Sequence, residues 1–161
     1  MSGSINQIQQ DAEDNIWIGH WRKGLIKIDA VTKKIIVYKD FDNAEANSSR
    51  RALCFLFDND KILVGTVING LQLFDKKSGT FVASYHLDEK NNHSLSNNNI
   101  TSIAAYNKDT LIVGTQGGIN IFDKNKKVFS AITSKDGLSN NLVQAIILDN
   151  EKNLWVALEG A

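Results

Sequence analysis

The chain repeats one pattern four times, and this repetition constrains its fold more than any other feature. The repeated segments read NIWIG at 15–19, KILVG at 61–65, TLIVG at 110–114 and NLWVA at 153–157. Successive anchor residues lie 46, 49 and 43 positions apart, at Gly19, Gly65, Gly114 and Ala157. A period in the forties, made of alternating strands and turns, is typical of a β-propeller in which each repeat forms one blade.

A second element follows each of the first three anchors after four or five residues. It reads GLIKID at 24–29, GLQLFD at 70–75 and GINIFD at 118–123. Each full repeat therefore predicts four short strands, with the anchor glycine permitting a bend at the end of the second. First strands are expected at 5–10, 54–57, 100–106 and 143–148, and outer strands at 35–39, 81–86 and 128–132. No segment predicts a helix.

The fold class is thus all-β: a β-propeller fragment of about three and a half four-stranded antiparallel blades. We expect blades at 5–50, 51–99 and 100–141, and the first half of a fourth at 142–161. Residues 1–4 carry no part of the pattern and are a candidate cloning remnant. Closed propellers use roughly four to eight blades, so we expect this chain to be a piece of a larger ring.

Charge and hydropathy argue against two classes of partner. The chain carries 18 basic and 18 acidic residues spread through every repeat, without the basic stripe of a nucleic-acid binder. The longest apolar run, 52–57, is far shorter than the roughly 18 residues of a membrane helix, so no membrane insertion is expected.

Cys54 is the only cysteine of the chain. It can form no internal disulfide, and it has no second cysteine at a metal-binding spacing. Its apolar neighbours Leu53, Phe55 and Leu56 favour a buried, inert thiol.

The repeat resembles a known family in its linker and first strands. The segment DGLSNNLV at 136–143, followed by Ile146, Asp149 and NLW at 153–155, resembles the two-component regulator propeller repeat. The same pattern recurs over 94–118 and 5–19. The second repeat departs from it, because it lacks the tryptophan and has Arg51 where the others have Ile5, Ile100 and Val143.

This resemblance implies a function for the parent protein. In that family the propellers form the periplasmic sensor region of bacterial hybrid two-component histidine kinases. Many of these kinases, in gut Bacteroides-type bacteria, detect oligosaccharides released from complex glycans. The implied role is a ligand-sensing segment without a cofactor, whose signal passes to a histidine kinase encoded elsewhere in the parent chain.

The residues themselves do not favour an enzyme. The three histidines, His20, His86 and His93, are expected at the surface, and the chain has no Gly-x-Ser-x-Gly elbow. A propeller lyase or hydrolase needs acid–base groups where the first strands end. Those strand ends offer no such pair, because they hold Gln9, Gln10, Phe57, Tyr106 and Leu148.

Two acidic clusters, at 11–14 and 58–60, raise the question of a calcium site. Neither has the glycine and distal glutamate of a calcium-binding loop. Both lie at predicted hairpin turns, where aspartate is favoured for backbone reasons. The sequence therefore predicts no metal site.

The candidate ligand site is the turn formed by His20, Trp21, Arg22 and Lys23. Connections between second and third strands share one face of a propeller with the linkers between blades, and Asn69 and Gln116 occupy the corresponding turns. A partly exposed indole can stack on a sugar ring while His20 and Arg22 donate hydrogen bonds. The alternative is an ordinary turn whose tryptophan packs on a neighbouring blade or a partner chain.

Two further expectations concern partners. A passive scaffold for protein–protein interaction stays open beside the sensing function. The incomplete blade would leave apolar residues uncovered, so we also expect self-association, or contact with the rest of the parent propeller.

Overall fold

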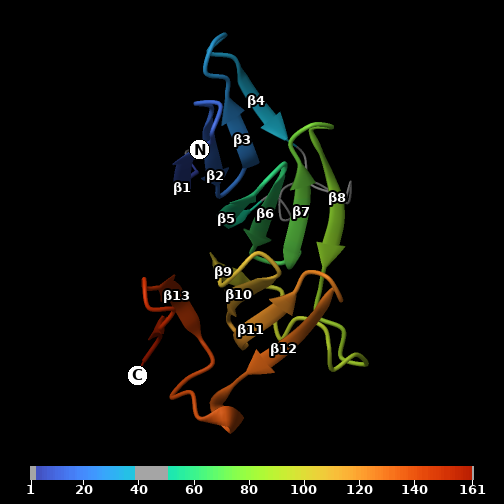
Figure 1. Cartoon of the computed structure of the whole chain (residues 1–161), viewed down its shortest axis with the longest axis vertical. Coiled ribbons are helices and arrows are strands. Elements are labelled where there is room, and N and C mark those ends of the chain that lie inside the picture. Colours follow the sequence, from blue (N-terminus) through green and yellow to red (C-terminus); the bar gives the residue numbers. More distant parts are fainter. Residues whose placement is uncertain (1–2, 39–50, 161) are drawn as a thin grey trace.

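The computed structural model describes residues 3–38 and 51–160. Within these ranges, fourteen β-strands form three four-stranded antiparallel sheets and one two-stranded sheet. In chain order we call the sheets blade 1, blade 2, blade 3 and half-blade 4. Figure 1 shows them following one another through the molecule, from the blue N-terminal blade to the red C-terminal half-blade. The prediction of an all-β propeller fragment is confirmed.

The strand bounds are as follows. Blade 1 contains β1 (Ile5–Gln10), β2 (Ile16–His20), β3 (Gly24–Ile28) and β4 (Ile35–Tyr38). Blade 2 contains β5 (Ala52–Asp58), β6 (Lys61–Thr66), β7 (Leu71–Asp75) and β8 (Thr80–Tyr85). Blade 3 contains β9 (Ile100–Ala105), β10 (Thr110–Thr115), β11 (Gly118–Asp123) and β12 (Val128–Ile132). Half-blade 4 contains β13 (Val143–Leu148) and β14 (Leu154–Leu158).

The expected first and outer strands match these bounds with small differences. β1, β12 and β13 have the predicted ends, whereas β5 begins two residues earlier than expected and β8 is displaced by one residue. The predicted end of β4, at Lys39, lies outside the described residues.

A short helix contradicts the expectation of none. Residues Ser134–Asp136 form one turn of 3-10 helix in the linker after β12. The side chain of Thr133 accepts a hydrogen bond from the N–H of Lys135, and Asp136 reaches back to the N–H of Thr133. This reciprocal capping stabilises a single turn that strand periodicity could not predict.

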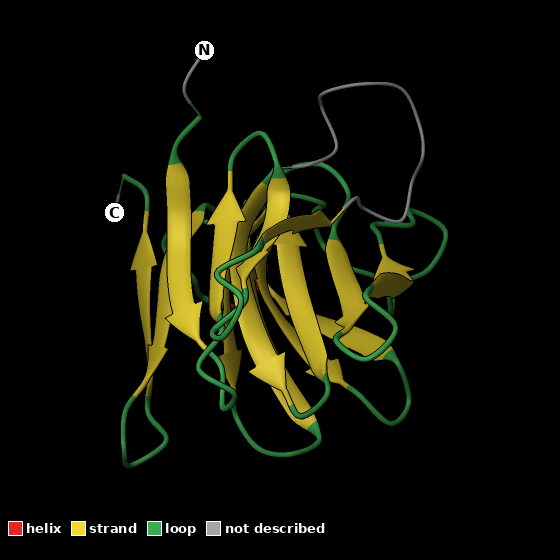
Figure 2. Ribbon diagram, turned by 90° about the horizontal axis from the view of Figure 1, so that it is seen from above, coloured by secondary structure: helices red, strands yellow, loops and turns green. Residues whose placement is uncertain are grey.

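The blades pack through their first strands. β1 contacts β5, β5 contacts β9, and β9 contacts β13. An apolar cluster lies between each successive pair of blades. Figure 2 shows the strands running between two opposite sets of turns, which form the two faces of the propeller segment.

Two of the three anchor glycines, Gly65 and Gly114, are required by this packing. A Cβ on Gly65 would lie 2.6 Å from Cγ2 of Ile100 in the next blade, and one on Gly114 would lie 2.7 Å from Cγ1 of Val143. These two glycines therefore permit close approach of the next first strand. In half-blade 4 the anchor is Ala157, which is exposed.

A β-bulge recurs near the start of each first strand. It lies just before the residue that pairs with the anchor residue of the same repeat. The register shifts between Ile5 and Gln7, and between Ala52 and Cys54. The same irregularity occurs at the starts of β9 and β13. By this register Ala52, and not Arg51, is the equivalent of Ile5, so the assignment of Arg51 to that position is wrong.

The repeated aspartate at the end of each third strand closes the next turn. Asp29, Asp75 and Asp123 each accept hydrogen bonds from two backbone N–H groups two and three residues further on. The backbone N–H of Thr32 and its hydroxyl lower the pKa of Asp29 to about 2. Local backbone capping thus explains this part of the repeat.

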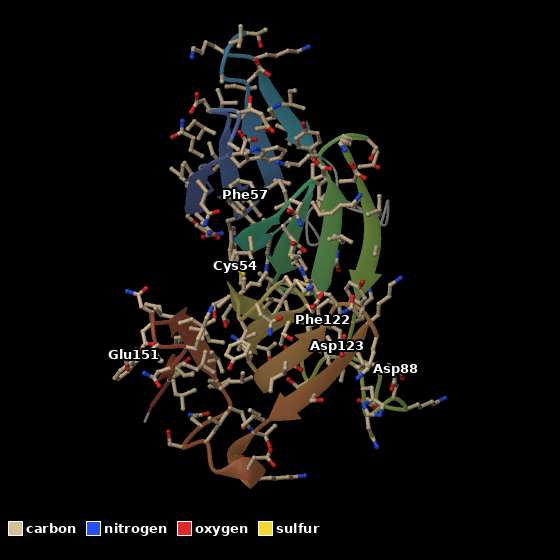
Figure 3. All side chains as sticks on the ribbon, viewed as in Figure 1. Cys54, Phe57, Asp88, Phe122, Asp123 and Glu151 are labelled. Atoms are coloured by element: carbon tan, nitrogen blue, oxygen red, sulfur yellow. The ribbon has the colours of Figure 1, made fainter. Side chains whose placement is uncertain are left out.

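Cys54 is buried between blades 2 and 3, as predicted (Figure 3). Burial disfavours the thiolate and raises the pKa of the thiol to about 12. The parts of the chain that the structure describes contain no helix long and apolar enough to cross a membrane.

Candidate functional site

The candidate residues lie in the turns between the second and third strands of blades 1, 2 and 3. The N–H of Gly70 donates to the carbonyl of Asn98 at 3.1 Å, and that of Gln116 donates to Asn99 at 3.2 Å. Asn98 and Asn99 belong to the linker between blades 2 and 3. These turns therefore share one face of the propeller with the linkers, which we call the linker face.

His20 braces its own turn. Its Nδ1 accepts hydrogen bonds from the backbone N–H groups of Arg22 at 2.9 Å and Lys23 at 3.1 Å. A ring nitrogen that accepts two such bonds carries no proton, so the neutral ring has its proton on Nε2. Of the two ring nitrogens, only Nε2 remains to donate to a ligand.

Trp21 contacts the next blade. The guanidinium carbon of Arg51 lies 4.9 Å from the centre of the indole ring, within cation–π range. The backbone N–H of Trp21 donates to the carbonyl of Ser4 at 2.9 Å. The side chain is half-buried, which agrees with the alternative in which this tryptophan packs on a neighbouring blade. Because Arg51 lies over one face of the ring, a sugar would have to stack on the other.

The remaining candidates have different surroundings. Arg22, Lys23 and Gln116 are exposed, and Asn69 is half-buried. The N–H of Asn69 donates to Oγ1 of Thr66 at 2.9 Å. Together with Trp21, these residues lie in three successive turns of the linker face, one per blade.

Two threonines brace the other turns in the way that His20 braces its own. Oγ1 of Thr66 donates to the carbonyl of Gly70, and Oγ1 of Thr115 donates to that of Gly118, both at 2.9 Å. Each threonine directly follows an anchor glycine, as His20 does. The sequence assigned a ligand role to His20, whereas its equivalents in the fold have a structural one.

A buried network holds the linker against blade 3. Asn120, which is fully buried, accepts from the N–H of Ser96 at 2.9 Å and donates to its hydroxyl at 2.8 Å. The hydroxyls of Ser96 and Thr115 lie 3.1 Å apart. This network holds the linker between blades 2 and 3 in place against blade 3.

Sequence reasoning missed Arg51 as a neighbour of Trp21. The alignment of the repeats placed Arg51 at the position equivalent to Ile5, one residue too far into the first strand. A side chain at that position would face the core. The carbonyl of Arg51 accepts from the N–H of Val67 at 3.3 Å, which places Arg51 beside the turn that contains Asn69. A one-residue shift in the alignment of the repeats would have revealed this position.

The other histidines form no catalytic arrangement within the described residues. Nε2 of His86 lies 2.8 Å from the hydroxyl of Ser84 on the exposed outer strand β8. No carboxylate is bonded to this pair among residues 3–38 and 51–160. His93 is exposed in the linker, where its carbonyl accepts from the N–H of Phe129 at 2.9 Å.

The two acidic clusters have structural partners. Oδ1 of Asp11 accepts from the N–H groups of Glu13 and Asn15, at 3.0 and 2.9 Å. Oδ2 of Asp58 lies 2.8 Å from Nζ of Lys124 in blade 3. No group of three or more metal-ligating side chains suited to an ion occurs in the described segments.

A family comparison matches parts of the first and the last repeat. The two-component regulator propeller model matches residues 1–22 and 137–160. The first range runs from residue 1 through the first two strands of blade 1 to Arg22 in the candidate turn, and the second covers part of the linker and half-blade 4. The prediction of this repeat type is confirmed. No curated protein matches the chain.

Solved structures share the fold at low sequence identity. One is the extracellular domain described as a hybrid two-component system of B. thetaiotaomicron, with 18% identity and a TM-score of 0.83 over 98% of this chain and 22% of that one. A second extracellular domain, described as a one-component system of the same organism, has 22% identity and a TM-score of 0.79 over 97% of this chain and 22% of that one. The chain thus spans about a fifth of these structures.

A computationally designed protein, Ika4, also shares the fold. It is 13% identical, and the match has a TM-score of 0.63 over 99% of this chain and 94% of that one. At such identities the likeness establishes the propeller fold alone.

Proposed function

This chain carries two-component regulator propeller repeats, and from that premise we propose that it is a ligand-sensing segment of a bacterial sensor histidine kinase that recognises oligosaccharides. The segment would lie in the periplasm and have no catalytic activity of its own. Extracellular domains among the structural neighbours support this location.

The observation that carries the ligand class is the position of Trp21. It is a half-buried tryptophan in a turn on the linker face, with Arg51 over its ring. An indole held in place by a neighbouring guanidinium loses little conformational freedom on stacking against a sugar. Exposed Arg22 and Gln116 offer hydrogen-bond donors from the same face.

Signal transmission would follow from the linker face. The turns of blades 2 and 3 on this face are hydrogen-bonded to linkers between blades, so a ligand bound to these turns would lie beside the linkers. A ligand that binds one arrangement of the blades more tightly shifts their packing by the difference in binding free energy.

The test is a calorimetric titration of the chain with a panel of plant and host-glycan oligosaccharides. Trp21→Ala should weaken binding by about 1–3 kcal/mol, the size of a lost aromatic contact. Trp21→Phe keeps a ring and should retain part of the affinity. Trp155→Ala is the matched control, because it removes another partly exposed tryptophan outside the linker face.

Two results would contradict the proposal. If Trp21→Ala bound the oligosaccharide as well as the unchanged chain, Trp21 would be a packing residue only. Turnover of any oligosaccharide that disappears on mutation of a single carboxylate or histidine would make the segment an enzyme.

A further inference from the structure

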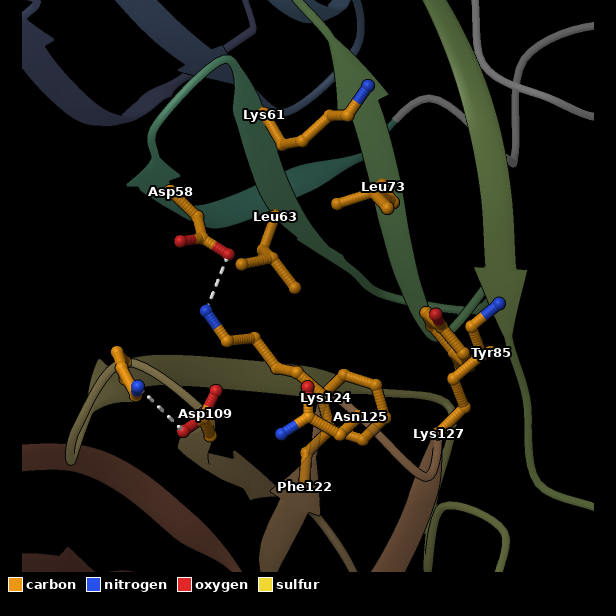
Figure 4. Close-up of a pocket in the computed structure, with 11 residues that line it drawn as sticks. Asp58, Lys61, Leu63, Leu73, Tyr85, Asp109, Phe122, Lys124, Asn125 and Lys127 are labelled. Atoms are coloured by element: carbon orange, nitrogen blue, oxygen red, sulfur yellow. Dashed lines mark hydrogen bonds and ion pairs between the residues drawn. The ribbon is translucent and has the colours of Figure 1, made fainter.

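A cavity of about 310 Å³ lies between blades 2 and 3, near the face opposite the linkers (Figure 4). Its apolar walls come from Leu63, Leu73, Tyr85 and Phe122. Its rim consists of the ends of β5 and β6 and the turns that join β9 to β10 and β11 to β12. The volume is at the lower end of the range for small-molecule sites.

The corresponding space between blades 1 and 2 is filled by Trp17. This side chain is 2% exposed, and its indole stacks on Tyr38 with ring centres 5.7 Å apart. It also packs edge-on against Phe57 and Phe74 of blade 2. The first interface between blades is therefore closed by an aromatic cluster around one indole.

Strand register shows why the second interface is open. Trp17 lies two residues before the anchor glycine of blade 1, and Leu63 lies two residues before the anchor glycine of blade 2. The two side chains therefore occupy equivalent positions. Tyr38 pairs with Leu25 as Tyr85 pairs with Leu71, so the two tyrosines are equivalent.

The residue that faces the tryptophan from the next blade is also smaller. Phe57 pairs with Ile62, which lies three residues before the anchor of blade 2. Ala105 pairs with Leu111, which lies three residues before the anchor of blade 3. Ala105 thus takes the place of Phe57. The cavity is therefore lined by the aromatic rings of Tyr85 and Phe122. It lacks the indole ring that fills the corresponding space between blades 1 and 2.

The rim is positively charged. Four lysines, Lys61, Lys108, Lys124 and Lys127, line the cavity with two aspartates, Asp58 and Asp109. Lys124 pairs with Asp58, Lys108 lies 3.9 Å from Asp109, and Lys61 pairs with Asp75 outside the cavity. Lys127 forms no ion pair with any described residue, and Figure 4 shows it at the Tyr85 end of the cavity.

We propose that this cavity binds a small molecule made of a flat aromatic ring with a carboxylate attached. The ring lies between Leu63 and the aromatic wall, where Trp17 lies in blade 1. The carboxylate faces Lys127, whose charge is otherwise uncompensated. This site is separate from the linker face and does not depend on the proposed oligosaccharide function.

Indole-3-acetate and its neutral analogue indole-3-acetamide are the probes, titrated into the 161-residue chain by calorimetry. Both should bind at one site, with the acid favoured about fivefold, the effect of one exposed charge pair. Leu63→Trp places an indole in the cavity and should abolish binding of both probes. Trp21→Ala should leave both affinities unchanged.

Charge variants separate the carboxylate contact from the fit of the ring. Lys127→Gln should weaken indole-3-acetate about fivefold and leave indole-3-acetamide unchanged. Lys126→Gln is the matched control, since Lys126 neighbours it in sequence but lies outside the cavity and should alter neither affinity. This pair of variants tests the proposal even if Leu63→Trp fails to fold.

Four outcomes would overturn the proposal. The first is a folded Leu63→Trp variant that binds the probes with unchanged affinity. The second is an equal loss of affinity for both probes in Lys127→Gln. The third is that neither probe binds at millimolar concentration. The fourth is tighter binding of glucuronate than of indole-3-acetate, which would indicate a sugar acid instead.

Discussion

The indole Nε1 of Trp17 donates a hydrogen bond of 2.6 Å to Oδ2 of Asp11, inside the interface between blades 1 and 2. Asn15 donates from its amide to both oxygens of the same carboxylate. In half-blade 4, the indole of Trp155 and the amide of Asn153 both donate to Oδ2 of Asp149. One spacing of aspartate, asparagine and tryptophan therefore builds one local structure in two settings, buried and exposed.

The first prediction concerns the Asp11 carboxylate. Burial opposes its charge, but hydrogen bonds from Trp17 and Asn15 outweigh this and lower its pKa. The folded state thus binds its proton less readily than the unfolded state does. Asp11→Asn should reduce the free energy of unfolding at neutral pH by about 1–3 kcal/mol.

The difference in unfolding free energy between the unchanged chain and Asp11→Asn should become smaller as the pH falls. The contribution of Asp11 is complete above its unfolded pKa, near 4, and disappears as the pH falls through the lower folded value. Urea denaturation between pH 7 and pH 2 measures it. A gap that stays constant over this range would contradict the account. Asp149→Asn is the control at the exposed copy and should have a smaller effect.

The second prediction compares the two equivalent tryptophans. Trp17 is 2% exposed and Trp155 is 66% exposed. Trp17→Leu should cost about 2–4 kcal/mol of unfolding free energy, because it leaves a cavity within the aromatic cluster. Trp155→Leu should change it by less than about 1 kcal/mol. Chemical denaturation checks both, and equal losses would show that the described half-blade buries its tryptophan in solution.

The third prediction concerns Gly70. Its φ is +62°, and a Cβ there would lie 2.0 Å from the carbonyl oxygen of Tyr85. Gly70→Ala must therefore displace backbone as well as adopt a left-handed conformation. Gly137 also has a positive φ, of +106°, but nothing within 4 Å of an added Cβ.

Gly137→Ala is thus a matched control for backbone strain alone, which costs about 1–2 kcal/mol. Gly70→Ala should lower the melting temperature clearly further than Gly137→Ala does. Similar melting temperatures for the two variants would show that blade 2 relaxes to admit the methyl group.

The fourth prediction is self-association through half-blade 4. In the described chain, Ile147 and Trp155 are 65% and 66% exposed on its two strands. Neighbouring exposed apolar side chains beside an open strand edge favour contact with another molecule. Light scattering at micromolar concentration should show species larger than a monomer.

Ile147→Lys should shift this distribution toward the monomer. Val31→Lys is the control, since Val31 is 88% exposed in a turn of blade 1. A monodisperse monomer in the unchanged chain would contradict the prediction. Equal effects of both lysines would point to net charge rather than to half-blade 4.

The blades and most of their strands could be predicted from the sequence alone. Strand periodicity, aspartate-rich turns and the spacing of Gly19, Gly65 and Gly114 are local signals, and each repeat states them again. The buried state of Cys54 followed from its apolar neighbours in the sequence. The two-component regulator propeller repeat could also be predicted, since its pattern recurs along the chain.

The contacts between blades could not be predicted in this way, because they join side chains from different repeats. The need for glycine at position 65 depends on Ile100, and the contact of Trp21 depends on Arg51, both distant in sequence. The cavity lies at the interface where Leu63 and Ala105 stand at the positions that Trp17 and Phe57 occupy at the preceding interface. Packing across an interface depends on the sum of side-chain volumes from two repeats, and the pattern of a single repeat does not contain that sum.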